Sequence, residues 1–154
     1  MKKYKIIKLK SFVNDTGKLV PVDFDKEVGI KIKRIFYIFG KKNSIRGDHA
    51  HKKCYQLFFP IKGSVNLTFT DGGKKKTIKL NPKKNVAVLI YNLVWCKLKF
   101  LSADSIVMVG CDRKYEFNDY IEEYSDFLKI VKKNEYNYYW CMWTHRILLY
   151  RKFR

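Results

Sequence analysis

The chain has 154 residues, enough for one domain with a sizeable buried core. Its hydrophobic content of 47%, together with 16% aromatic residues, argues against an intrinsically disordered chain. The formal net charge of +19 favours an anionic partner such as nucleic acid, a membrane surface or a phosphorylated small molecule, although the lysines are spread along the chain and compositional bias alone would also explain it.

Targeting and cysteine signals point to a protein of the reducing cytoplasm. Residues 1–10 contain no apolar core of a signal peptide, and no run of about 18 apolar residues predicts a transmembrane helix. The cysteines Cys54, Cys96, Cys111 and Cys141 show neither a C-x-x-C pair nor a zinc-ligand spacing.

Short β-rich segments separated by turn residues occupy most of the chain. Strands are predicted in order at residues 4–12, 19–24, 30–39, 49–59, 65–70, 77–80, 86–91, 95–101 and 105–111. The turns between them include residues 14–17, 60–63, 71–73 and 81–85, which are rich in Gly, Pro, Asn and Asp. Because no helix is predicted between the strands, the pattern favours an all-β antiparallel sandwich or barrel.

A helical pattern follows the last strand. Asp119 and Glu122 have the spacing of a capping box, and apolar residues then recur on one helical face at Tyr120, Tyr124, Phe127, Leu128 and Val131. We expect this helix to cover the outside of a sheet. Residues 1–132 are predicted to be one domain, and residues 133–154 a basic aromatic tail. Trp140 and Trp143 in this tail could dock on the barrel, a second subunit or a membrane surface.

The segment of residues 44–53 is the main candidate for a functional site. It contains His49 and His51, and alternate residues of a strand point to the same face, so both imidazoles would enter one cavity. Such a pair can bind a metal or transfer protons. Arg46 and Gly47 precede it, and arginine is suited to a carboxylate or phosphate partner. The alternative is a surface strand that carries polar residues without function.

A metal site is tested by comparing this segment with the metal-binding motif of cupins. That motif resembles H-x-H-x(3,4)-E-x(6)-G, and His49, His51 and Gly63 match it. Gln56 stands where a glutamate ligand is expected, and the later strand has Trp95 and Cys96 but no histidine. Two imidazoles alone bind a divalent ion poorly, so the sequence predicts no metal and favours proton transfer by the histidines.

Several segments together resemble one family, the sugar-nucleotide 3,4-ketoisomerases of the WxcM-like, FdtA-type cupin group. They are R-G-D-H-A-H-K-K at residues 46–53 with Gln56, G-S-V at 63–65, I-K-R-I-F-Y-I at 32–38, Trp95, L-S-A-D-S-I-V-M-V at 101–109 and Y-E-F-N-D-Y-I at 115–121. The resemblance covers about residues 4 to 130 and is much more specific than the H-x-H pair alone.

The resemblance implies a cupin fold, a jelly-roll barrel with a C-terminal helix, that forms a homodimer without a cofactor. The family moves the ketone of dTDP-4-keto-6-deoxyglucose from C4 to C3, for 3-amino-3,6-dideoxy sugars of surface glycans. The resemblance also implies that His49 and His51 are the catalytic residues. Arg46, Tyr37, Gln56, Lys53 and Trp95 are the expected substrate-binding residues. Arg46 could bind the diphosphate or stabilise the enediolate, and Tyr37 could equally be a core tyrosine.

The chain also departs from this family. Cys96 follows Trp95 where many relatives have histidine, and Thr16 precedes Gly17 where many have arginine. Both changes concern the pocket, so the configuration produced at C4 stays open. Two other functions also stay open, a non-catalytic sugar-nucleotide- or RNA-binding cupin and a metal-dependent cupin enzyme. No nucleic-acid partner or stable membrane insertion is expected under the preferred interpretation.

Overall fold

Strands are the main secondary structure of residues 3–134, the part of the chain that the computed structural model describes. Their bounds are β1 Tyr4–Lys8, β2 Phe12–Asn14, β3 Gly17–Leu19, β4 Arg34–Gly40, β5 Ile45–His51, β6 Gln56–Lys62, β7 Val65–Thr70, β8 Lys76–Leu80, β9 Val86–Ile90, β10 Trp95–Phe100, β11 Ser105–Cys111 and β12 Tyr120–Ile121. Short helical turns lie at Phe24–Val28, Pro82–Lys84 and Phe117–Asp119, and a helix covers residues 124–134. The prediction of an all-β fold with a C-terminal helix is confirmed.

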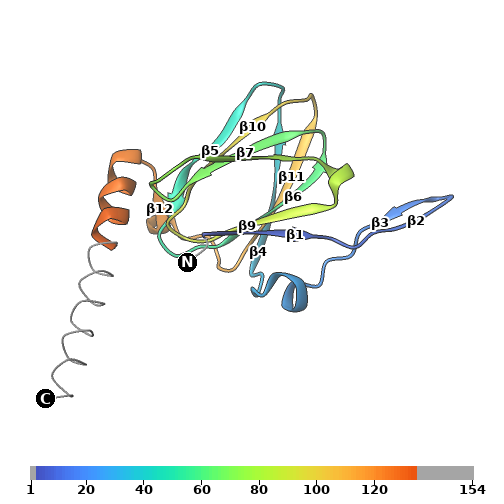
Figure 1. Ribbon diagram of the computed structural model, residues 1–154, viewed down its shortest axis with the longest axis horizontal. Helices are drawn as coiled ribbons and strands as arrows, with labels where there is room; N and C mark the ends of the chain where they lie inside the picture. The colour runs from blue at the N-terminus through green and yellow to red at the C-terminus, as the bar shows by residue number, and fades with distance from the viewer. Residues whose placement is uncertain (1–2, 135–154) are drawn as a thin grey trace, which may run out of the picture.

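Two five-stranded sheets face each other (Figure 1). Their strand orders are β1-β9-β6-β11-β4 and β12-β5-β10-β7-β8. Adjacent strands pair antiparallel throughout, as the turn-rich sequence predicts. The β2–β3 hairpin projects away from the barrel, on the opposite side from the C-terminal helix (Figure 1).

The apolar core is divided into three layers by the alternation of side chains along the strands. The central layer lies between the sheets and includes Leu67, Phe100 and Val107, which are fully buried. An outer layer that includes Leu57 and Val28 is contributed by the first sheet and the residues before β4. The third layer joins Ala50, Trp95, Ile121 and Phe127, so the C-terminal helix covers the outside of the second sheet as predicted.

The start of this helix was predicted wrongly. The capping-box pattern placed it at Asp119, but Tyr120 and Ile121 instead form β12 and pair with His51 and Ala50 of β5. Helical residues begin only at 124. The reason is tertiary, because the Asp119 carboxylate accepts hydrogen bonds from another part of the chain and the segment gains a strand partner.

The predicted strand 49–59 is also two strands. The histidine strand β5 ends at His51, and the chain turns before β6 begins at Gln56. The turn predicted at 60–63 is confined to its end, since β6 continues to Lys62 and the chain turns at Gly63, whose φ is +75°, before β7. Proline has no backbone N–H to donate to a neighbouring strand. Pro60 is tolerated inside the sheet because the pairing of β9 with β6 ends at Phe58, so β9 needs no donor from Pro60.

At the N-terminus, the predicted strand 4–12 is divided between β1 and β2, and the strand predicted at 19–24 is replaced by β3 and the helical turn at Phe24–Val28. The apolar residues around Pro21 alternate as they would in a strand, but no neighbouring strand in the described part of the chain pairs with residues 20–24. The tail prediction at Trp140 and Trp143 lies outside the described residues. Within residues 3–134, no helix has the length and apolar character needed to cross a membrane.

Candidate active site

The two histidines are placed by a bulge in β5. Gly47 and Asp48 have φ values of +79° and +66°, and the register with β10 shifts so that Cys96 faces His49 while Lys97 faces Gly47. Asp48, which has no partner residue in β10, accepts a hydrogen bond of 2.9 Å from Trp95 Nε1 on the outer face. Beyond the bulge, His49 and His51 share the inner face, and their ring centroids lie 5.1 Å apart. The prediction that both imidazoles point to one side is therefore confirmed.

His51 is held by a carboxylate from the far end of the chain. Its Nδ1 lies 2.9 Å from Asp119 Oδ2. The same carboxylate accepts the backbone N–H groups of Lys53 at 2.7 Å and Cys54 at 3.2 Å. Among the described residues, the buried Nε2 of His51 has no hydrogen-bond partner. With Nδ1–H donating to Asp119, Nε2 carries the lone pair and can accept a proton.

Both histidines are kept neutral by their surroundings. Burial lowers the pKa of His49, and it also lowers the pKa of His51 against the opposing effect of Asp119. The neighbouring His49 lowers the pKa of His51 further. Near neutral pH, both imidazoles are therefore available as bases.

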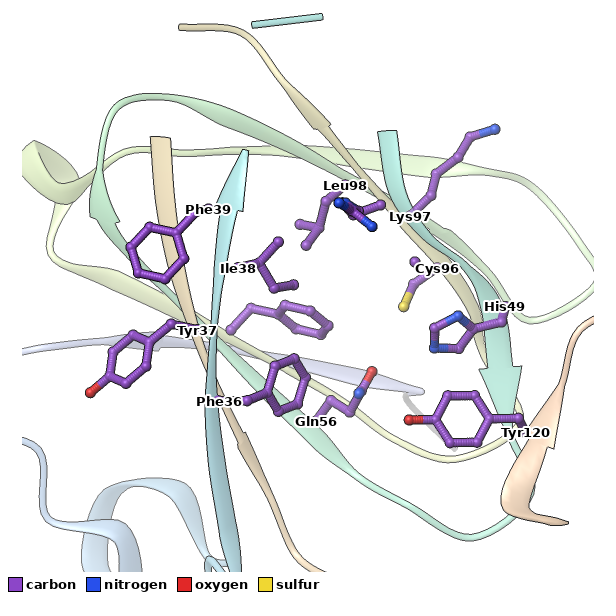
Figure 2. A pocket seen from close by; sticks show the side chains of 13 residues that line it. Phe36, Tyr37, Ile38, Phe39, His49, Gln56, Cys96, Lys97, Leu98 and Tyr120 are labelled. Atoms are coloured by element: carbon purple, nitrogen blue, oxygen red, sulfur yellow. The ribbon is translucent and has the colours of Figure 1, made fainter. Parts of the chain in front are cut away.

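A cavity of about 460 Å³ opens in front of His49, within the range of small-molecule sites. Arg46 and Gln56 line it together with His49, so the structure brings these three predicted residues to one place. His51 lies deeper, with 4% of its surface exposed, behind the wall that His49 and Tyr120 form. Lys97 also belongs to the lining, but its side chain lies on the outer face of β10, where its Nζ is 3.7 Å from Asp48 Oδ2, and Figure 2 shows it directed away from His49 and Gln56. Arg46 is therefore the cation that borders the cavity among the described residues.

Tyr37 belongs to the cavity lining, but its side chain is directed elsewhere. Figure 2 shows Tyr37 and Phe39 on the opposite side of β4 from Phe36 and Ile38, which face His49. The side chain of Tyr37 is 56% exposed. Strand alternation explains this position, because residues 37 and 39 share the outer face of β4.

Two further predicted residues are not brought to the cavity. Trp95 lies on the outer face of β10, where its ring packs against Tyr124 and Phe127. Lys53 is exposed in the turn after β5 and contacts the site through its backbone N–H, which donates to Asp119. The hydrogen bond from Trp95 to Asp48 stabilises the bulge on the outer face of the sheet. Trp95 therefore positions His49 without lining the cavity.

The sequence reasoning missed Tyr120 and Asp119 as site residues, because it assigned both to a helix. Tyr120 lines the cavity, and its ring centroid lies 5.0 Å from that of His49 and 4.4 Å from that of His51. The segment Y-E-F-N-D-Y-I at residues 115–121 was noted as a family feature, and this was the signal that could have identified them.

Below the histidines, Arg34 and two thiols form a buried group. Arg34 Nη2 donates to Cys111 Sγ at 3.4 Å. The contacts with Cys54 and Arg34 lower the pKa of Cys111, and the pKa of Cys54 is raised by its interaction with Cys111 and by burial. The pKa of Cys96, beside His49, is raised to about 12 by burial.

His51, Cys54 and Asp119 bring their potential ligand atoms within 4.8 Å of one another. The donor set nevertheless fits a metal poorly. The two Asp119 oxygens already accept three hydrogen bonds, and the raised pKa of Cys54 keeps its proton on sulfur. These residues are better explained as the support that orients His51.

Comparisons with known proteins agree on one family. The model of the WxcM-like, C-terminal family, FdtA, matches residues 2–132. A TDP-4-oxo-6-deoxy-alpha-D-glucose-3,4-oxoisomerase of Aneurinibacillus thermoaerophilus is 33% identical over 130 residues, which are 84% of this chain and 93% of the relative.

Solved structures give the same relationship. A 3,4-ketoisomerase from Helicobacter canadensis has a TM-score of 0.81 and 32% identity, covering 86% of this chain and 99% of its own. The sugar 3,4-ketoisomerase QdtA of Thermoanaerobacterium thermosaccharolyticum, in complex with TDP, has a TM-score of 0.81 and 29% identity over 86% of this chain and 96% of its own. A variant of QdtA was solved with TDP-4-keto-6-deoxyglucose.

Proposed function

The chain belongs to the WxcM-like, C-terminal family, and we propose that it is a sugar-nucleotide 3,4-ketoisomerase acting on dTDP-4-keto-6-deoxyglucose. The observation that carries this proposal is a pair of neutral imidazoles beside a cavity that the cation Arg46 borders. The resemblance to 3,4-ketoisomerases over 84% to 86% of this chain supports the same reaction.

The proposed chemistry begins at C3 of the sugar, where the adjacent C4 ketone acidifies the C–H bond. His49 lines the cavity and takes this proton, giving an enediolate. The proton then returns at C4, and the ketone is left at C3. His51 lies in edge-to-face contact with His49, and Asp119 fixes its tautomer, so it takes part as the second member of the proton-transfer pair.

Substrate recognition is assigned mainly to the nucleotide diphosphate. Arg46 is the cation that borders the cavity, and an arginine fork suits a diphosphate. Gln56 is only 6% exposed at the inner wall and supplies an amide for a sugar oxygen. Cys96 lies beside His49, so its small neutral thiol is a further candidate for shaping the site around C4.

We also propose a homodimer with exchange of an N-terminal strand. The β2–β3 hairpin projects from the barrel with Phe12, Val13 and Leu19 exposed. The outer face of β4, an edge strand, exposes Ile35, Tyr37 and Phe39. Exposed apolar groups of this extent usually mark an interface, and a second copy would also cover the sheet edge.

The proposed reaction is tested by incubating dTDP-4-keto-6-deoxyglucose with the protein in D2O and following the sugar by proton NMR. The ketone should move to C3, and C4 should show a new proton signal if the transferred proton is retained, or lack that signal if it exchanges with D2O. His49→Asn and His51→Asn should each lower kcat by about 10² or more, the usual scale for a lost acid or base. Both variants should still bind free dTDP.

The controls separate the other functions. Treatment with EDTA should leave the rate unchanged, and complete loss in EDTA would favour a metal-dependent cupin enzyme. Binding of dTDP without turnover by the wild type would favour a sugar-nucleotide-binding cupin. Full turnover by both histidine variants would contradict the proposed roles of the histidines.

A further inference from the structure

Tyr120 is a cavity residue that the histidine mechanism leaves without a role. It is held in β12 directly opposite His51 of β5, and its ring contacts both imidazoles. Figure 2 shows its hydroxyl directed into the cavity, on the same side as the Gln56 amide and the His49 ring. A phenol in this position can exchange a proton with a bound sugar.

The proposed reaction itself requires a second proton-transfer group. The substrate has a ketone at C4 and an H–C–OH centre at C3, and the product has these reversed. One proton therefore moves from C3 to C4, and another must leave O3 while one arrives at O4. The histidine pair accounts for the transfers at carbon, but the transfers at oxygen need a donor and acceptor of their own.

We propose that Tyr120 is a catalytic residue that carries the proton between the two sugar oxygens. This inference rests on the proposed ketoisomerase function. As His49 takes the C3 proton, the Tyr120 O–H gives its proton to O4 of the developing enediolate, so that the negative charge passes to the phenol and a neutral enediol and a tyrosinate form. The tyrosinate then takes the O3 proton, while the protonated histidine gives its proton to C4. Both residues return to their starting states, and all protons are balanced.

Arg34 makes a transient tyrosinate less costly. Burial raises the pKa of Tyr120, but the guanidinium of Arg34 opposes this by stabilising the phenolate. Arg34 of β4 is held by its hydrogen bond to Cys111 Sγ and by stacking on Tyr115, with Arg34 Cζ 5.4 Å from the ring centroid. Arg34 is thus a positioning residue that acts through Tyr120.

Other titratable groups besides Arg34 lie close to Tyr120. His49 and His51 face it from β5, Cys111 from β11, and Tyr115 from the loop before β12. Burial, and then Tyr115 and Cys111, raise the pKa of Tyr120. The phenol therefore starts the reaction protonated, as the proposed first step requires.

The deciding variant is Tyr120→Phe, which keeps the ring and removes the hydroxyl. We expect kcat to fall about 10²-fold, with the KM and the dissociation constant for dTDP within about threefold of the wild type. Tyr91→Phe is the matched control, because Tyr91 packs against Tyr55 on the outer face of the first sheet. It should retain the wild-type rate.

Each outcome has a separate meaning. An unchanged kcat in Tyr120→Phe, or a raised KM with unchanged kcat, would overturn the catalytic role while leaving the ketoisomerase function intact. Failure of the wild type to convert the substrate would instead refute the proposed function. If Tyr120→Phe does not fold, 3,5-difluorotyrosine at position 120 lowers the phenol pKa while keeping its shape. The basic limb of kcat should then move to lower pH, and an unmoved limb would overturn the proposal.

Discussion

At the scale of single residues, Asp119 organises the candidate site. Its carboxylate joins the end of β5 to the turn that follows, and it fixes the tautomer of His51. It also opposes the lowering of the His51 pKa by burial. Burial and the Asp119 charge thus have opposite effects on the pKa of His51, and burial is the larger. The imidazole therefore stays neutral while Asp119 orients it.

This balance predicts the acid side of the pH profile. A histidine base works only when neutral, and the pKa values of His49 and His51 are lowered from 6.5. The acid limb of kcat/KM should therefore have its midpoint below pH 6.5. In Asp119→Asn, the pKa of His51 should fall further, because the carboxylate that favours its protonated form is gone.

The measurements are a pH–rate profile and an NMR titration of the histidine rings. We expect Asp119→Asn to lower kcat roughly tenfold to a hundredfold, the usual effect of removing a group that orients a functional histidine. Asp126→Asn, in an exposed ion pair with Lys129, serves as the control and should change neither quantity. An acid limb at or above pH 6.5, or a raised His51 pKa in the Asp119→Asn variant, would refute this account.

At the scale of elements, the C-terminal helix supports the histidine strand from outside. Phe127 is fully buried against Trp95, and Trp95 donates to Asp48 in the bulge that precedes His49. The packing of the helix on the outer face of the second sheet therefore helps to direct the His49 side chain on the inner face. Trp95 contributes to the site through this support, although it lies outside the cavity.

Truncation of the buried helix residue tests this support. Phe127→Ala should lower the free energy of unfolding by about 3–5 kcal/mol, since it removes a large side chain and leaves a cavity under the helix. Ser125→Ala, on the exposed side of the same helix, should leave the unfolding midpoint unchanged. Urea unfolding followed by tryptophan fluorescence measures both. A loss below about 1 kcal/mol for Phe127→Ala would mean that the helix contributes little to the fold.

At the scale of the whole molecule, exposed apolar side chains gather on the hairpin and on the edge strand β4. Val13 is 73% exposed and Phe39 is 72% exposed, which is unusual for such large apolar groups outside an interface. The strong positive charge is otherwise expected to keep copies apart. A specific apolar contact is therefore needed to hold two copies together.

We predict a homodimer that depends on the N-terminal segment. Deleting residues 1–12 should give monomers or insoluble protein, and the latter outcome is understandable because Ile7 is buried in β1. The double variant Phe12→Ser with Val13→Ser leaves β1 intact and should give soluble monomers. Deleting residues 134–154 should leave the dimer and the activity largely unchanged.

Sedimentation equilibrium of the full chain and these variants measures the association directly. A monomeric full-length protein would contradict the dimer. A dimer that is lost only with residues 134–154 would assign the interface to the tail in place of the N-terminal segment.

Local sequence patterns determined the antiparallel all-β architecture, the covering helix and the shared direction of His49 and His51. These features depend on periods of two or about four residues and on nearby turn residues, so neighbouring positions suffice to predict them. The approach of Asp119 to His51, the placing of Tyr120 in the cavity and the outward direction of Trp95 were decided only by the tertiary structure. They depend on strand pairing and register between segments up to 68 residues apart, and no local period carries that information.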